Sequence, residues 1–256
     1  MQRNIPLAVC VGGGILDAEK TAKGEENMKV LFVGNSHTYF NDMPRLFARM
    51  CAALTGEEPR VQMLAYSNRG LAWHREEYYA LRFALLYGGF DYCVLQQQAH
   101  PMPPEAETRA ALRQIMALCR QCGTEPVLFM TWAMKAEPEV APVMCGFYRQ
   151  LAAETGALLC PVGERFAALT AEHPEIELYW KDGAHASPAG DYLIAALFAA
   201  LLTGRGNAEG VGDEALDFRT DFEGENGLPL SEEDAGRVAF RLDPVTAATL
   251  REYARL

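Results

Sequence analysis

The sequence predicts an α/β fold, a three-layer α/β/α sandwich built on a mostly parallel, flavodoxin-like sheet. Three observations support this prediction. Short apolar runs alternate with amphipathic helical patterns along most of the chain. The helical patterns are mostly a dozen or more residues long, as crossovers between parallel strands require. The chain has 256 residues, of which 50% are hydrophobic, and this is enough to bury the core of one such domain.

The first strand is expected at residues 29–33, closed by Gly34. It leads into a helix whose apolar face carries Met43, Leu46, Phe47 and Met50. Further strands are expected at residues 61–66, 92–96, 126–132 and 158–162, and further helices at 71–86, 104–122 and roughly 138–155.

The carboxyl-terminal part begins with a well-marked helix start. Ser187 and Pro188 are typical N-cap and N1 residues, and the helix is expected to run to Gly204. Residues 204–227 are rich in glycine and acid and are expected to form a loop. Two short helices are expected after it, opened by Ser231 with Asp234 and by Asp243 with Pro244.

The composition bounds the partners and the compartment. A formal net charge of −11 argues against nucleic acid and anionic membranes as partners, because both would be approached against a repulsive field. Small neutral or cationic substrates fit this charge. The seven cysteines are an odd number in apolar contexts, which is typical of buried free thiols in a reducing compartment, so a cytoplasmic protein is expected. Residues 5–16 form an apolar run that is too short to span a bilayer. They match a secretory signal only weakly, so secretion stays a weaker alternative.

Two motifs carry candidate chemistry. Ser36 lies in a loop directly after the first strand, where open α/β sheets place their ligands. Asp182 stands three residues before His185 in a turn that contains Gly183. A carboxylate at this spacing can hold one ring nitrogen of the imidazole, which leaves the other free to take a proton from a serine.

Together these motifs resemble those of the SGNH (GDSL-like) hydrolases. Gly34-Asn35-Ser36 resembles block I of that family, Gly70 in the loop after the second strand resembles block II, and Asp182 to His185 resembles block V. The resemblance implies metal-free ester hydrolysis with no cofactor. It also implies Ser36 as nucleophile, His185 as base and then acid, and Asp182 as its orienting partner. The backbone N–H groups of Ser36 and Gly70 would then face the oxyanion.

The third block of the family departs from the usual pattern. A Leu-Gln-x-Gln stretch stands where a glycine and an asparagine are usual, and the strand continues into Gln96-Gln97-Gln98-Ala99-His100. Gln98 is favoured as the third oxyanion donor and His100 is the alternative, while Gln96 is expected to fix the loop. Trp132, at the end of the next strand, is expected either to stack on a sugar or acyl group or to pack in the core.

The resemblance divides the chain into three parts. Residues 1–27 are expected to be an amino-terminal extension, 28–205 the SGNH hydrolase domain, and 206–256 an acidic loop with a helical appendage packed on that domain. The expected function is a serine esterase for small acyl esters, with acetyl groups on carbohydrate as the expected substrate. A lipase-like or thioesterase-like acylhydrolase and a non-catalytic ligand-binding domain remain the alternatives. Neither the oligomeric state nor the alcohol of the substrate follows from the sequence.

Overall fold

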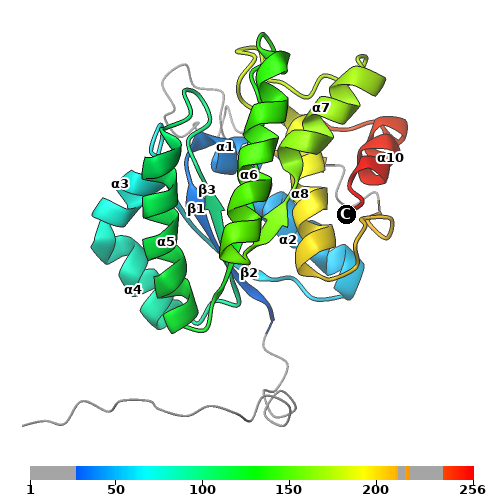
Figure 1. The fold of residues 1–256 in the computed structure, drawn as a ribbon. Coiled ribbons are helices and arrows are strands. Elements are labelled where there is room, and N and C mark those ends of the chain that lie inside the picture. Colours follow the sequence, from blue (N-terminus) through cyan, green and yellow to red (C-terminus); the bar gives the residue numbers. More distant parts are fainter. Residues whose placement is uncertain (1–26, 213–216, 220–238) are drawn as a thin grey trace, which may run out of the picture.

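The computed structural model describes residues 27–212, 217–219 and 239–256. Five parallel strands form its main sheet in the order β2-β1-β3-β4-β5 (Figure 1). They are β1 (Lys29–Gly34), β2 (Arg60–Ala65), β3 (Tyr92–Gln96), β4 (Glu125–Phe129) and β5 (Leu158–Cys160). The predicted parallel sheet is therefore confirmed.

Helices cover both faces of the sheet, as predicted. On one face lie α2 (Met43–Thr55), α7 (Val162–Glu172) and α8 (Pro188–Leu202). On the other lie α3 (Leu71–Glu76), α4 (Tyr78–Gly88), α5 (Glu105–Gln121) and α6 (Ala141–Thr155). Alternate residues of β1 point to opposite faces, so Val30 and Phe32 pack in the first layer while Leu31 and Val33 pack in the second.

Several elements differ from the sequence prediction, among them the strand expected at 126–132, which ends at Phe129. The helix expected at 71–86 is two helices, because Glu77 has the non-helical ψ of 48°. The strand expected at 158–162 ends at Cys160, and the unpredicted α7 follows Pro161, which has no N–H to donate to a ladder. Part of the expected loop at 204–227 is strand β6 (Asp217–Arg219), which pairs with β7 (Ala239–Arg241) in a two-stranded antiparallel sheet. The helix expected at Ser231 lies outside the described residues.

Helix α8 is the central element of its layer. Its start is as predicted: Pro188 is the first residue, and the Ser187 side chain accepts the N–H of Gly190 at 3.1 Å. The helix is apolar on nearly all sides because the sheet, α2 and α10 (Pro244–Tyr253) all pack around it. This burial fixes the position of the segment just before it, which carries His185.

The cysteines of the described residues were predicted to be buried free thiols. Six described cysteines are free thiols, and all but Cys122 are buried. Cys10 lies outside the described residues. Among the described helices, none is both long and apolar enough to cross a membrane.

Candidate active site

The loop after β1 presents Ser36 as the first residue of the short helix α1 (Ser36–Tyr39). Its N-cap is Asn35, whose side chain accepts the N–H of His37 at 3.0 Å. Asn35 also donates to the carbonyl of Arg69 at 3.0 Å, which ties this loop to the loop after β2. Ser36 is therefore held at the carboxyl edge of the sheet, and its own N–H, at the first helical position, has no acceptor inside the helix.

Gln96 fixes the same loop from the end of β3. This fully buried side chain accepts the N–H of Asn35 at 2.8 Å and the hydroxyl of Thr38 at 3.0 Å. A Cβ on Gly34 would stand 2.5 Å from the Gln96 Oε1, so glycine is required at this crossing. The expectation that Gln96 fixes the loop matches these contacts.

Gln97 holds the loop after β2 in a similar way, and the sequence analysis gave it no role. Its Oε1 accepts the N–H groups of Leu71 and Gln98, each at 2.9 Å, while its Nε2 donates to Thr108. A Cβ on Gly70 would stand 2.7 Å from that same oxygen. The backbone of Gly70 is thus pressed close to the end of β3.

The Asp182 segment is a tight turn between two hydrogen-bonded flanks. Tyr179 and Ala186 form an antiparallel bridge across it, and Gly183 takes a φ of +71°. Asp182 Oδ1 accepts the backbone N–H groups of Ala184 and His185 at 2.9 and 3.0 Å. One oxygen of the carboxylate therefore builds the turn and the other is left for the imidazole.

The two motifs meet in a Ser-His-Asp arrangement. His185 Nε2 lies 2.8 Å from Ser36 Oγ, and His185 Nδ1 lies 2.6 Å from Asp182 Oδ2. The serine and the histidine are 149 residues apart in the chain. This is the geometry in which an imidazole can take the hydroxyl proton while a carboxylate fixes its tautomer.

Two rings enclose the imidazole of His185. Phe40 stacks on it with a centroid distance of 4.2 Å and an interplanar angle of 10°, and His37 lies at 4.8 Å. The side chain of His185 stays 23% exposed, so a substrate can still reach it. These contacts limit the rotation of the ring and keep Nε2 directed at Ser36.

The neighbouring ionisable groups have shifted pKa values. Burial, with the nearby His185 and His100, lowers the pKa of His37 to about 3, so this imidazole is neutral beside His185. Burial alone would raise the pKa of Asp182, but the hydrogen bonds from His185 and the turn backbone outweigh it and hold the pKa below its ordinary value. Asp182 is therefore ionised at neutral pH.

The two candidates for the third donor occupy different places. Gln98 lies beside Gly70, with its Cβ 3.6 Å from the position of a Cβ on that glycine, and its amide donates to Asn68 at 3.3 Å. His100 packs instead against His37 at 5.5 Å, and its ring bonds to the backbone of Trp132. Its Nε2 is enclosed and has no hydrogen-bond partner. Of the two side chains, Gln98 is the one that lies beside the loop that carries Gly70.

Trp132 lies in the core, the second of its two expected positions. It is 1% exposed and stacks on Phe166 at 4.5 Å, so neither ring face is open to a sugar or acyl group. Its indole N–H donates to the carbonyl of Ala184 at 2.9 Å. The expectation that Trp132 stacks on a substrate group is therefore wrong. Trp132 instead supports the turn that carries His185.

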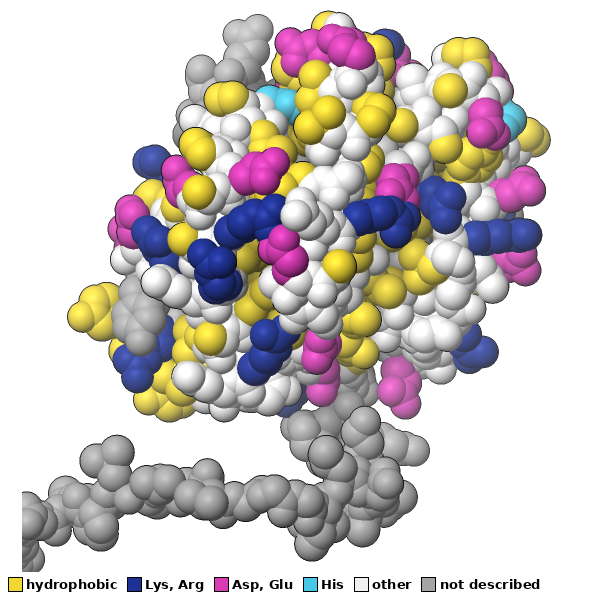
Figure 2. Space-filling view, in the orientation of Figure 1, with side chains coloured by type: hydrophobic (Ala, Val, Ile, Leu, Met, Phe, Trp, Pro, Cys, Tyr) yellow, Lys and Arg dark blue, Asp and Glu magenta, His cyan; other side chains and the backbone are white. Residues whose placement is uncertain are grey.

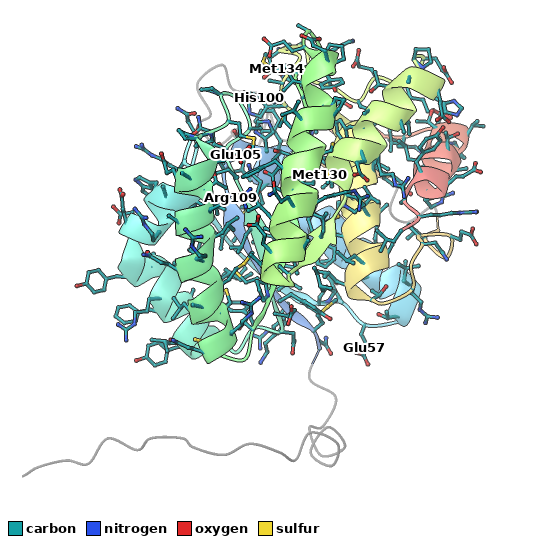
Figure 3. The ribbon with its side chains drawn as sticks, viewed as in Figure 1. Glu57, His100, Glu105, Arg109, Met130 and Met134 are labelled. Atoms are coloured by element: carbon teal, nitrogen blue, oxygen red, sulfur yellow. The ribbon has the colours of Figure 1, made fainter. Side chains whose placement is uncertain are left out.

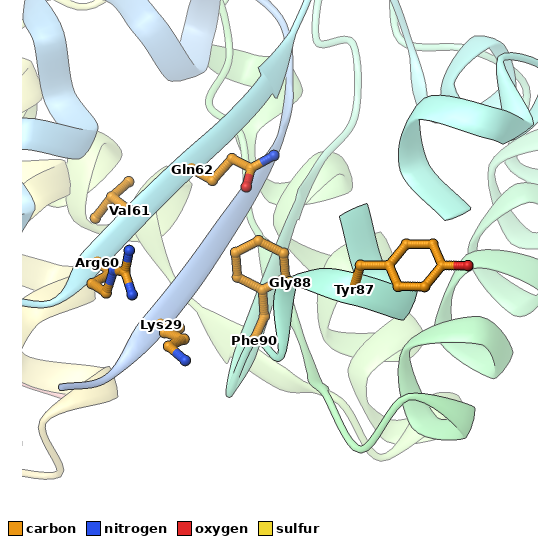
Figure 4. A pocket seen from close by; sticks show the side chains of 7 residues that line it. All are labelled: Lys29, Arg60, Val61, Gln62, Tyr87, Gly88 and Phe90. Carbon is orange, nitrogen blue, oxygen red and sulfur yellow. The ribbon is translucent and has the colours of Figure 1, made fainter. Parts of the chain in front are cut away.

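Two pockets lie at opposite ends of the sheet. A cavity of about 670 Å³ opens between α5 and α6 at the carboxyl edge, where Figure 3 labels His100, Glu105 and Met134. Its lining is mainly apolar and includes Ala99, Met102, Ala133 and Met144. The other, of about 420 Å³, is lined by Lys29 and Arg60 at the amino ends of β1 and β2 (Figure 4). Only the first lies at the edge where open α/β sheets bind ligands.

The described residues contain no group of three or more His, Cys, Asp and Glu side chains that would hold a metal ion. On the face formed by α5 and α6, Figure 2 shows basic and acidic side chains close together. Some of them pair across helices, as Arg109 does with Glu154 and Arg149 with Glu164.

The protein thus has an α/β fold with a Ser-His-Asp arrangement at the carboxyl edge of its sheet. No protein-family model and no curated protein matches the sequence. Solved structures do match. Axe2, an acetylxylan esterase from Geobacillus stearothermophilus, is 17% identical with a TM-score of 0.55, and the match covers 68% of this chain and 93% of that one.

Two further structures match equally well. LAE5, an alpha/beta hydrolase from the metagenome of Lake Arreo in Spain, is 19% identical with a TM-score of 0.55, over 69% of this chain and 95% of that one. TesA is 16% identical with a TM-score of 0.54, over 69% of this chain and 97% of that one. At these identities the likeness is one of fold, an α/β fold with a five-stranded parallel sheet flanked by helices.

Proposed function

We propose that this chain is a serine esterase that hydrolyses small acyl esters, with a preference for acetyl esters, through an acyl-enzyme intermediate. The observation that carries the proposal is the pair of contacts at His185, 2.8 Å to Ser36 and 2.6 Å to Asp182. The fold likeness to an acetylxylan esterase supports acetyl as the acyl group and a carbohydrate as its carrier.

The proposed mechanism assigns one step to each group. Ser36 Oγ attacks the ester carbonyl while His185 takes its proton, and His185 then returns a proton to the leaving alcohol. Asp182 stabilises the imidazolium that forms between these steps. The backbone N–H groups of Ser36 and Gly70 and the amide of Gln98 stabilise the oxyanion. Water then hydrolyses the acyl-enzyme by the same proton route.

A longer acyl chain is the second candidate, and one observation favours it. The cavity of about 670 Å³ that includes His100 is lined mainly by apolar side chains and is larger than an acetyl group needs, although its lining does not include Ser36 or His185. Glu105 and Glu137 also line it, which disfavours an anionic group there. An acylhydrolase for longer chains would use the same three catalytic residues.

Hydrolysis of p-nitrophenyl acetate, butyrate and octanoate tests these functions. We expect the acetate to have the highest kcat/KM; a clear preference for octanoate would favour the longer-chain enzyme. Replacing Ser36 or His185 by alanine should lower kcat on the order of 10³-fold or more, because the members of a triad act as a unit. Ser67→Ala, at an exposed serine of the loop after β2, is the matched control and should retain activity. Absence of turnover on all three esters would favour a non-catalytic binding domain.

A further inference from the structure

The segment that follows Ser36 contacts the segment that follows His185 in the interior of the protein. Asn41 Nδ2 donates to Asp191 Oδ2 at 2.6 Å and to the carbonyl of Ala186 at 3.1 Å. Ala186 is the residue next to His185, and Asp191 lies in the first turn of α8. One amide group therefore joins the nucleophile segment to both the histidine segment and the helix that follows it.

The backbone around Asn41 is held in a conformation that must be maintained by its contacts. Asn41 and Asp42 have consecutive positive φ values of 49° and 55°, in the left-handed region that non-glycine residues rarely adopt. Such conformations persist only where the surroundings fix them, and they concentrate at functional sites. The side chain of Asn41 is 2% exposed, so its contacts are within the protein.

Asp191 is an unusual partner for this amide because it is completely buried. Among the described residues its Oδ1 has no hydrogen-bond partner, and its Oδ2 accepts from Asn41. Burial raises the pKa of Asp191 well above its ordinary value, although the hydrogen bond from Asn41 acts in the opposite direction. Asp191 orients the amide of Asn41, because its Oδ2 accepts one of the two N–H groups of that amide.

We propose that Asn41 and Asp191 are positioning residues that hold the His185 segment against the Ser36 segment and so maintain the contact between Ser36 and His185. This inference rests on the proposed function. With one N–H held by Asp191, the other N–H of Asn41 is directed at the carbonyl next to His185. The other contacts between the two segments include the ring contacts of His185, its contact with Ser36, and the hydrogen bond of His37 to the backbone of Ala184.

Variants of both residues separate positioning from folding. Asn41→Gly removes the amide and accepts the positive φ without strain. Asp191→Leu keeps the approximate size but removes the acceptor, whereas Asp191→Asn keeps an acceptor oxygen on a side chain of the same shape. Leu197→Ala is the stability control, because it removes a fully buried side chain from the same helix at a distance from the site.

We expect Asn41→Gly and Asp191→Leu to lower kcat on p-nitrophenyl acetate on the order of 10²-fold with little change in KM, the effect typical of a small misplacement of catalytic groups. Asp191→Asn should recover most of this loss. Leu197→Ala should lower the midpoint of thermal unfolding and keep kcat. Wild-type kcat in Asn41→Gly and Asp191→Leu, with only reduced thermal stability, would overturn the proposal.

Crystal structures of the variants supply a readout that does not depend on turnover. Asn41→Gly should move His185 Nε2 out of hydrogen-bond range of Ser36 Oγ, and Asp191→Asn should retain the contact. An unchanged contact in Asn41→Gly would contradict the positioning role even if the wild-type protein hydrolysed none of the esters. Failure of the proposed function is seen separately, as absence of turnover in the wild type.

Discussion

At the scale of single residues, the third oxyanion donor can be identified by replacing Gln98 and His100 separately. Gln98→Ala should lower kcat on a short acetyl ester by an amount equivalent to about 2.7–4 kcal/mol, with little effect on KM, because the amide would act only in the transition state. His100→Ala should lower it much less, since the Nε2 of His100 is enclosed. Comparing kcat and KM for the two variants measures this directly. A large loss confined to His100→Ala would show that the ring turns toward the substrate.

The catalytic candidates were predicted from the sequence because each lies in a short motif, Ser36 in one and Asp182 with His185 in the other. Asp182 and His185 are three residues apart and share one turn, so a local motif contains their whole relationship. The bond between Asn41 and Asp191 joins residues 150 positions apart, and neither carries a local signal of it. The Asn-Asp pair at 41 and 42 did offer a sign of a left-handed turn, because both residue types tolerate positive φ.

At the scale of elements, the strands and most of the long helices were predicted because their apolar periodicity is set by burial on the sheet, but the 11-residue helix α7 was not predicted. The break at Glu77 was not predicted, since no glycine or proline marks it in the sequence. Strand β6 has only three residues, too few for a period-2 pattern to stand out in a glycine-rich stretch. Short elements defined by long-range pairing are thus the part of the fold that local patterns do not contain.

The start of α8 offers a prediction about one element. Ser187 Oγ accepts the N–H of Gly190 and donates to the carbonyl of Glu177 at 2.6 Å, so one hydroxyl caps the helix and anchors the His185 hairpin. Ser187→Ala should lower the free energy of unfolding by about 1–2 kcal/mol, as loss of an N-cap does. Thr203→Ala, at the other end of α8, is the control and should cost less. Urea denaturation of both variants measures the difference, and equal losses would contradict a special role for the cap.

At the scale of the whole molecule, the buried histidines determine how stability depends on pH. Burial, the largest cause in each case, lowers the pKa values of His37, His74 and His100 from the ordinary 6.5. The unfolded chain therefore binds protons below that pH which the folded chain does not. By linkage, the free energy of unfolding rises with pH in this range and falls as the solution is acidified.

Asp191 has the opposite effect on the pH dependence of the free energy of unfolding. Its raised pKa gives a contribution to stability that is fully present below its ordinary value of 3.8 and is lost as the pH rises through the folded value. One carboxyl thus opposes three imidazoles, so we expect a net loss of stability between about pH 6.5 and about pH 5, measured by urea denaturation. His37→Phe should reduce this pH dependence, because it removes the histidine whose pKa falls to about 3. A free energy of unfolding that stays constant across this range in the wild type would mean that the three imidazoles are protonated within the folded state.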